Sequence, residues 1–288
     1  EYSQPIYWNL APNRDLTFTP MFWSDRGINT STEFRYLDND GKNAPPYLGQ
    51  LRIDYMTDDK IRDNTARWAT KYSHSGVANP YVYGGTLGLN VNVNRASDHN
   101  YWKDFAFTNP FGGQRLLSND ALLSWSDGVF LTSLRVQKWQ TLQDLASPAA
   151  RITAPFDRVP QITGRIQKYN LPGGFDASLD GDFSRFESSR FQDCDAARSQ
   201  TAADASYKTY ANCAPNANRF VSVAQLSRPF TTPYGYLTPK VQLHSRTYQF
   251  EDGLPNVGFY SRQATGNYAG LTSANVTVPT VSLDTSAV

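Results

Sequence analysis

Several sequence features that usually indicate a function are scarce or missing in this sequence of 288 residues. Its three histidines, His74, His99 and His244, lie far apart, and none has the spacing of a metal-ligand pair. Basic residues exceed acidic ones by a single charge, so no basic surface for nucleic acid is predicted. No nucleophile elbow or phosphate-binding loop is present. We therefore expect no enzyme, no metal and no cofactor.

Long apolar runs are also missing. No stretch approaches the roughly 20 residues of a membrane helix, so any bilayer crossing would need a closed β-barrel. The mean hydropathy of −0.53 does not exclude one, because only alternate residues of a barrel strand face lipid. Glu1 opens directly in patterned sequence without a targeting segment, and the strand predicted around residues 278–283 has barely begun when the chain ends. We therefore expect a fragment of a longer protein.

Cysteine is nearly absent. The two cysteines, Cys194 and Cys213, both lie in a polar stretch from Ser188 to Asn218. No histidine or further cysteine is near them, which argues against a metal site. The pair is interpreted as a local disulfide that closes a long loop in an oxidising compartment.

What the sequence does contain is alternation of apolar and polar side chains. Residues 16–22 and 28–36 alternate on either side of a turn at Ser24–Gly27. Successive side chains of a strand point to opposite faces, so this pattern predicts a hairpin. The longest run, residues 81–94, is interpreted as a single strand. Its apolar face would hold Tyr81, Tyr83, Leu87, Leu89, Val91 and Val93.

The opposite faces of these strands are predicted to line a wet lumen. An apolar face of this length, backed by Asn, Thr and Gly, suits a wall between lipid and water. Sandwich strands are usually shorter, at about 5–6 residues. Carboxylates on such a face could serve acid–base catalysis, but a polar strand face explains them without it. The residues predicted to face the lumen are Asn90, Asn92, Asn94, Asp176, Asp180 and Asp182.

About a dozen strand candidates follow one another, with no helical stretch, internal repeat or linker between them. Short turns alternate with longer polar loops at residues 38–49, 98–119, 187–218 and 251–274. Outer-membrane barrels show this alternation, although a soluble up-and-down barrel could show it too. Aromatic residues near the strand ends favour a membrane girdle over a carbohydrate platform. The predicted fold is all-β: one incomplete antiparallel transmembrane β-barrel domain over residues 1–288.

Two prolines flank or enter the first strand. Proline cannot donate to a sheet ladder, so within sheets it is confined to edges and bulges. Pro5 and Pro20 would therefore either weaken pairing with a neighbouring strand or simply mark strand ends.

The string Tyr7-Trp8-Asn9-Leu10-Ala11-Pro12-Asn13, followed by Asp15 and later by Phe34-Arg35-Tyr36-Leu37, resembles the opening of the transmembrane barrel in the LptD family of lipopolysaccharide-assembly proteins. The resemblance extends through Leu51–Tyr55, Arg67-Trp68, Ser97-Asp98 and Asp104-Phe105. It weakens afterwards, and the cysteine-bearing loop does not match.

The resemblance implies the N-terminal part of a barrel in the cell outer membrane of a Gram-negative cell. The jelly-roll domain and the closing strands of such a protein would be missing. It further implies an LptE-like lipoprotein plug in the lumen and a periplasmic Lpt bridge that delivers lipopolysaccharide. In that family, prolines at the positions of Pro5 and Pro20 weaken a lateral gate through which lipopolysaccharide enters the outer leaflet. The alternatives are a fragment of a generic porin or receptor barrel and a soluble glycan-binding β-protein.

Overall fold

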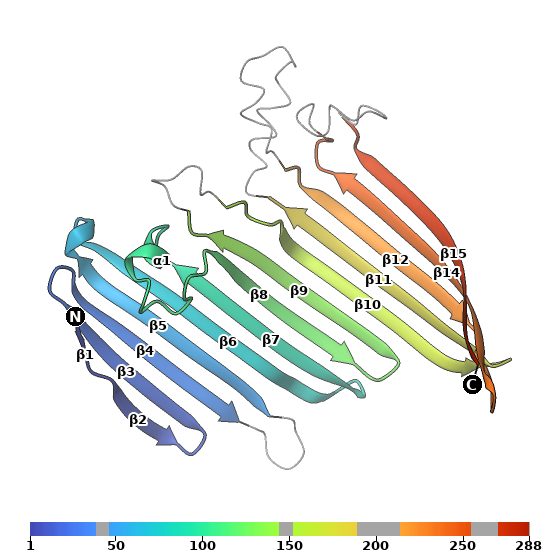
Figure 1. Cartoon of the computed structure of the whole chain (residues 1–288), viewed down its shortest axis with the longest axis horizontal. Helices are drawn as coiled ribbons and strands as arrows, with labels where there is room; N and C mark the ends of the chain where they lie inside the picture. Colours follow the sequence, from blue (N-terminus) through green and yellow to red (C-terminus); the bar gives the residue numbers. More distant parts are fainter. Residues whose placement is uncertain (39–45, 144–151, 189–213, 255–269, 288) are drawn as a thin grey trace. The chain divides into compact units, whose positions relative to one another are not determined.

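The computed structural model of the protein describes residues 1–38, 46–143, 152–188, 214–254 and 270–287 (Figure 1). Within these residues there are fifteen strands and two short helices, a 3-10 helix η1 (Lys60–Arg62) and α1 (Tyr101–Asp104). The strands are β1 (Tyr2–Ser3), β2 (Ile6–Ala11), β3 (Arg14–Trp23), β4 (Gly27–Asp38), β5 (Tyr47–Asp59), β6 (Thr65–Val82), β7 (Gly85–Ala96), β8 (Leu116–Ser126), β9 (Phe130–Thr141), β10 (Asp157–Leu171), β11 (Phe175–Glu187), β12 (Ala217–Ser227), β13 (Phe230–Thr232), β14 (Gly235–Phe250) and β15 (Ser273–Ala287). Neither helix, nor any other in the described part of the chain, has the length and apolarity needed to span a membrane.

The chain divides into two compact units, residues 1–123 with 137–155 and residues 124–136 with 156–288. In the first unit, β3 to β7 pair antiparallel in chain order, and β1 and β2 both pair with β3. In the second unit, β10, β11, β12 and β14 pair antiparallel, and β13 and β15 also pair with β14. The hairpin β8–β9 has residues in both units. The prediction of an all-β antiparallel fold, as in the strands of an incomplete β-barrel, is confirmed.

Each ladder keeps its apolar side chains in register on one face. In the first unit the pairs Leu16–Phe34, Phe34–Leu51 and Leu51–Tyr72 follow one another across four strands. In the second unit Ile166 pairs with Leu179. Large side chains on these faces are exposed, among them Phe18, Ile53, Trp68, Ile166, Leu179 and Phe220. An apolar surface of this extent is expected to be covered by lipid or by another apolar partner.

One predicted strand is in fact a hairpin. β6 ends at Val82 and β7 begins at Gly85, so the single strand predicted over residues 81–94 is wrong. The turn residues Tyr83 and Gly84 have φ values of 49° and 77°, as a two-residue hairpin turn with positive φ at both positions requires. The alternation did not reveal this turn, because Tyr81 and Tyr83 are in phase with Leu87. The Gly84-Gly85 pair was the signal that did mark it.

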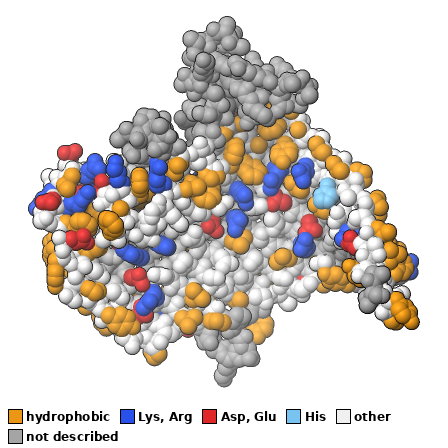
Figure 2. Space-filling view, viewed as in Figure 1, with side chains coloured by type: hydrophobic (Ala, Val, Ile, Leu, Met, Phe, Trp, Pro, Cys, Tyr) orange, Lys and Arg blue, Asp and Glu red, His pale blue; other side chains and the backbone are white. Residues whose placement is uncertain are grey.

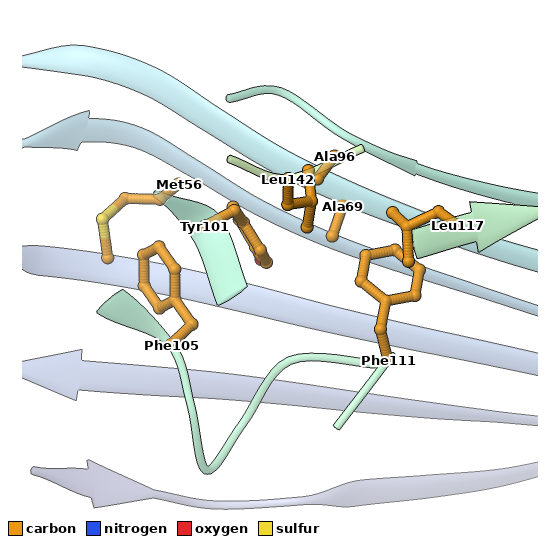
Figure 3. Close-up of a cluster of buried hydrophobic side chains, with 8 residues drawn as sticks. All are labelled: Met56, Ala69, Ala96, Tyr101, Phe105, Phe111, Leu117 and Leu142. Carbon is orange, nitrogen blue, oxygen red and sulfur yellow. The ribbon is translucent and has the colours of Figure 1, made fainter. Parts of the chain in front are cut away.

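The loop predicted over residues 98–119 is also partly wrong. Residues 98–114, here called the packed segment, contain α1 and fold onto the polar face of the first unit, while β8 begins at Leu116. α1 lies across β5 to β7 in Figure 1. The segment supplies three aromatic residues to a buried cluster, drawn in Figure 3. That cluster consists of Met56, Ala69, Ala96, Tyr101, Phe105, Phe111, Leu117 and Leu142.

Candidate functional site

The strand formed by β1 and β2, here called the edge strand, lies at the border of the first unit. Within the described residues, β3 is the strand with which β1 and β2 pair. Tyr2 pairs with Phe22 and Ile6 pairs with Phe18, so one register runs through both pieces. The ladder is interrupted between them, at Gln4 and Pro5.

Pro20 removes a hydrogen bond between the edge strand and β3. The backbone N–H of Gln4 donates to the carbonyl oxygen of Pro20 at 3.3 Å. The N–H and C=O groups of one strand residue point to the same side, so the nitrogen of Pro20 also faces the edge strand. A residue with an N–H would return a second bond to Gln4, and proline cannot.

Pro5 removes a donor from the opposite side of the edge strand. Because Gln4 directs its backbone groups toward β3, the next residue directs its own away from β3. The carbonyl oxygen of Pro5 accepts instead from the side-chain amide of Gln4 at 3.4 Å. The two prolines therefore reduce the number of backbone hydrogen bonds available on both sides of the edge strand.

The other side of β3 is intact. β3 and β4 pair without interruption from Arg14–Tyr36 to Trp23–Gly27. Pro20 is opposite Thr30 in this ladder and its backbone nitrogen faces the other way, so no β3–β4 bond is lost. Large apolar side chains of the edge strand are exposed, namely Tyr2, Ile6, Tyr7, Trp8 and Leu10. The main-chain ladder to β3 is thus the principal attachment of this strand.

Beside this edge, a buried ion-pair network fixes the packed segment to the strands. The side chain of Arg67 is 3% exposed and contacts the carboxylates of Asp59, Asp98 and Asp104 at 2.8–2.9 Å. The Asp59 side chain is fully buried and also contacts Arg26 at 2.6 Å. Such buried charges are tolerated only when each has a partner and hydrogen bonds.

Asp98 is a carboxylate of this network whose charge links the stability of the protein to pH. Burial alone would raise the pKa of Asp98, but hydrogen bonds from Arg67 and Ser97 outweigh it and lower the pKa below its usual value. A carboxylate with a lowered pKa stabilises the folded state fully at neutral pH. That stabilisation is lost as the pH falls below about 4, toward the pKa of the folded state.

We accordingly expect the melting temperature of the full-length protein to fall between pH 5 and pH 3, and to fall less in Asp98→Asn. The measurement is thermal unfolding followed by tryptophan fluorescence in detergent. Identical pH profiles for the two proteins would show that Asp98 does not contribute.

A family model described as "LptD: LPS transport system D" matches residues 65–288 of this chain. The chain belongs to the LptD family. Proteins named "LPS-assembly protein LptD" are 43% identical over 290 residues in Albidiferax ferrireducens, 45% over 262 in Paracidovorax citrulli and 40% over 290 in Polaromonas sp.. These alignments cover 99%, 89% and 99% of this chain but 31%, 28% and 30% of the relatives. The chain therefore spans about 30% of the length of these LptD relatives.

The family is described by transport and assembly, so the prediction that the chain is not an enzyme is confirmed. The family model begins at residue 65, whereas two of the three relatives match over 99% of the chain and so take in nearly all of its opening segment. The string Tyr7–Asn13 therefore lies in the part of the chain that the relatives alone cover.

The polar residues predicted to face the lumen lie on polar strand faces in separate units. In the first unit, Asn90 accepts a hydrogen bond from Ser75 at 2.7 Å, and Asn94 donates to Asn92 at 3.0 Å. In the second, Asp180 pairs with Arg165, and Asp182 contacts Gln161, Ser184 and Arg219. Asp176 differs, since it accepts from the backbone N–H of Asn170 at a turn. That these residues line a lumen stays a prediction.

Cys194 and Cys213 lie outside the described residues. Sequence reasoning missed the network of Arg67 with Asp59 and Asp104, which joins residues up to 37 positions apart. A signal was present, because Arg67, Asp98 and Asp104 all belong to the stretches that resemble LptD.

Proposed function

We propose that this LptD-family chain is part of an outer-membrane β-barrel that inserts lipopolysaccharide into the outer leaflet, and that its edge strand is one side of a lateral gate. The observation that carries the proposal is the placement of Pro5 and Pro20. They remove backbone donors from both sides of one strand while the β3–β4 ladder stays complete. A strand that must separate from its neighbours is where missing donors have a physical use.

The two faces of the strands support the membrane setting. Apolar side chains such as Ile166 and Leu179 are exposed on one face, and charged pairs such as Arg165–Asp180 lie on the other. Figure 2 shows basic and acidic side chains intermixed on the face in view. A soluble glycan-binding protein would bury the apolar face, and a generic porin would not need a weakened first strand. The polar face would accommodate sugar head groups and an LptE-like plug, with lipopolysaccharide supplied through the periplasmic Lpt bridge.

The test restores donors at the edge. In the full-length protein in its native outer membrane, Pro5→Ser with Pro20→Ser is expected to strengthen pairing of the edge strand and to reduce newly exported surface lipopolysaccharide several-fold. The amount is measured by pulse labelling and surface accessibility. Pro239→Ser, the same change in β14, is the matched control and should export normally. Normal export by the double variant, at equal protein levels, would return Pro5 and Pro20 to markers of strand ends.

A further inference from the structure

We propose that the packed segment, residues 98–114, is a brace that holds β3 to β7 as one rigid body, so that movement at the gate is confined to the edge strand. This inference rests on the proposed gate and specifies which pairing yields. The juxtaposition that carries it is at β3. One side of that strand has an interrupted ladder to the edge strand, and its polar face is clamped by the packed segment.

The clamp on β3 and on the β3–β4 turn is aromatic and ionic. Trp23, the last residue of β3, meets the ring of Phe105 edge to face, with the centroids 6.1 Å apart. Arg26, in the β3–β4 turn, lies 5.1 Å above the same ring and contacts Asp104 at 3.7 Å. Met21 of β3 is only 4% exposed. The end of β3 is thereby fixed to the packed segment through side chains and not only through its ladder.

The same segment is fixed to β5 and β6. Arg52 of β5 donates to the carbonyl oxygen of Thr108, and Lys71 of β6 donates to that of Pro110 at 3.3 Å. Arg67 of β6 lies 4.9 Å above the ring of Phe105. A charged donor on a backbone carbonyl and a cation over a ring are both directional contacts, so the segment resists sliding as well as lifting.

The connection reaches β9 as well. His99 contacts the carbonyl oxygen of Thr141 through Nδ1 at 3.0 Å, and Leu142, just beyond β9, lies in the buried cluster. In addition to their ladders, these strands are thus cross-linked at one end by a single segment. The edge strand differs, because its backbone pairs with β3 and its aromatic contact, Tyr2 with Phe22, is also with β3.

A simpler interpretation is that the packed segment only adds a small core and raises overall stability. The two interpretations differ in where a loosened segment shows its effect. A core without a bracing role lowers the free energy of unfolding of the whole barrel, and amide exchange by global opening then rises everywhere. A brace acts on the strands that it clamps.

The test is hydrogen–deuterium exchange of the full-length protein in detergent, read by peptide mass spectrometry. In the unmodified protein, the edge-strand amides are expected to exchange at least tenfold faster than the amides that pair β3 with β4. In Phe105→Ala, exchange in β3–β4 should rise at least tenfold, while exchange in β11–β12 stays unchanged. Phe183→Ala, an exposed phenylalanine of β11, is the matched control and should leave β3–β4 as it was.

Equal rises of amide exchange in β3–β4 and in β11–β12 of Phe105→Ala would overturn the brace. Unchanged amide exchange in β3–β4 of that variant, if it folds, would overturn it too. If Phe105→Ala does not fold, the double variant Lys71→Met with Arg52→Gln removes the contacts to the carbonyl oxygens of Thr108 and Pro110. Amide exchange in the β3–β4 peptides should then rise by a smaller factor. No rise in those peptides would also overturn the brace. The gate itself is judged by export in the proline variants. Normal export there with the expected exchange pattern would refute the gate and leave the brace standing.

Discussion

Gly76→Ala is expected to destabilise the protein by about 1–3 kcal/mol or more, the usual cost of forcing an extra group into a filled space. A Cβ at Gly76 would lie 2.2 Å from the Cβ and 2.5 Å from the Cα of Tyr47. These atoms are attached to the β5 backbone, so a rotamer change cannot relieve the clash. The measurement is urea unfolding of the full-length protein in detergent, followed by tryptophan fluorescence.

Gly181→Ala is the matched control for this prediction. Gly181 is also in the interior of a strand, yet the nearest atom to its added Cβ would be the carbonyl oxygen of Gly164 at 4.0 Å. Its free energy of unfolding should change by less than about 0.5 kcal/mol, as at an uncrowded site. Equal losses in the two variants would mean that glycine matters in these strands for backbone reasons and not for space.

Gly49 shows the same crowding with a softer neighbour. An added Cβ there would meet the ring of Tyr36 at 2.3 Å, and the hydroxyl of that ring is hydrogen-bonded to Tyr72 at 3.0 Å and to His74 at 2.7 Å. A ring can move where a backbone cannot, although these bonds resist it. Aromatic side chains laid over strand glycines are a recognised way of fixing register. They tie β4 to β5 and β6 on the apolar face.

The hairpins that the sequence predicted well are those where alternation and turn chemistry agree. Residues 14–38 contain both, and β3 and β4 meet at the predicted turn Ser24–Gly27. The same agreement of alternation with turn residues is present at Asp127-Gly128, between β8 and β9, and at residues 172–174, between β10 and β11. Alternation alone misled over residues 81–94, because Tyr81 and Tyr83 have the same parity as Leu87 in the sequence although the pairing of Val82 with Gly85 shifts the phase at the turn.

The candidate site was predictable in part. Pro5 and Pro20 could be singled out because proline is unusual in a strand. The side to which each lost donor points depends on the register of Gln4 with Pro20, which no local pattern reveals. The packed segment was harder still, since its four-residue helix has no periodicity to detect. It is held by contacts such as Arg67 with Asp98, 31 residues apart.

Arg67→Met is expected to lower the free energy of unfolding by about 3 kcal/mol. Removing one partner of a buried ion pair costs about 3–5 kcal/mol, because the remaining charge stays buried without compensation. The lower end applies here, since Asp59 keeps its contact with Arg26 and Asp104 keeps Arg62. Urea unfolding in detergent measures the change. Coupling between Arg67 and Asp98 is tested with the double variant. Asp98→Asn should lower the free energy of unfolding less in the Arg67→Met protein than in the unmodified protein.

The comparison variant is Arg165→Met, which breaks a pair on the surface of the second unit. The Arg165 side chain is 54% exposed and contacts one carboxylate, that of Asp180. Exposed pairs contribute about 0–1 kcal/mol, because water screens the charges and the side chains lose freedom when they pair. A loss in Arg165→Met as large as that in Arg67→Met would contradict the role given to burial. A large loss of unfolding free energy in Arg67→Met alone would show that the stability of the first unit depends on the buried ion-pair network. That network includes Arg26, in the turn after β3, and β3 is the strand that must stay fixed in the proposed gate.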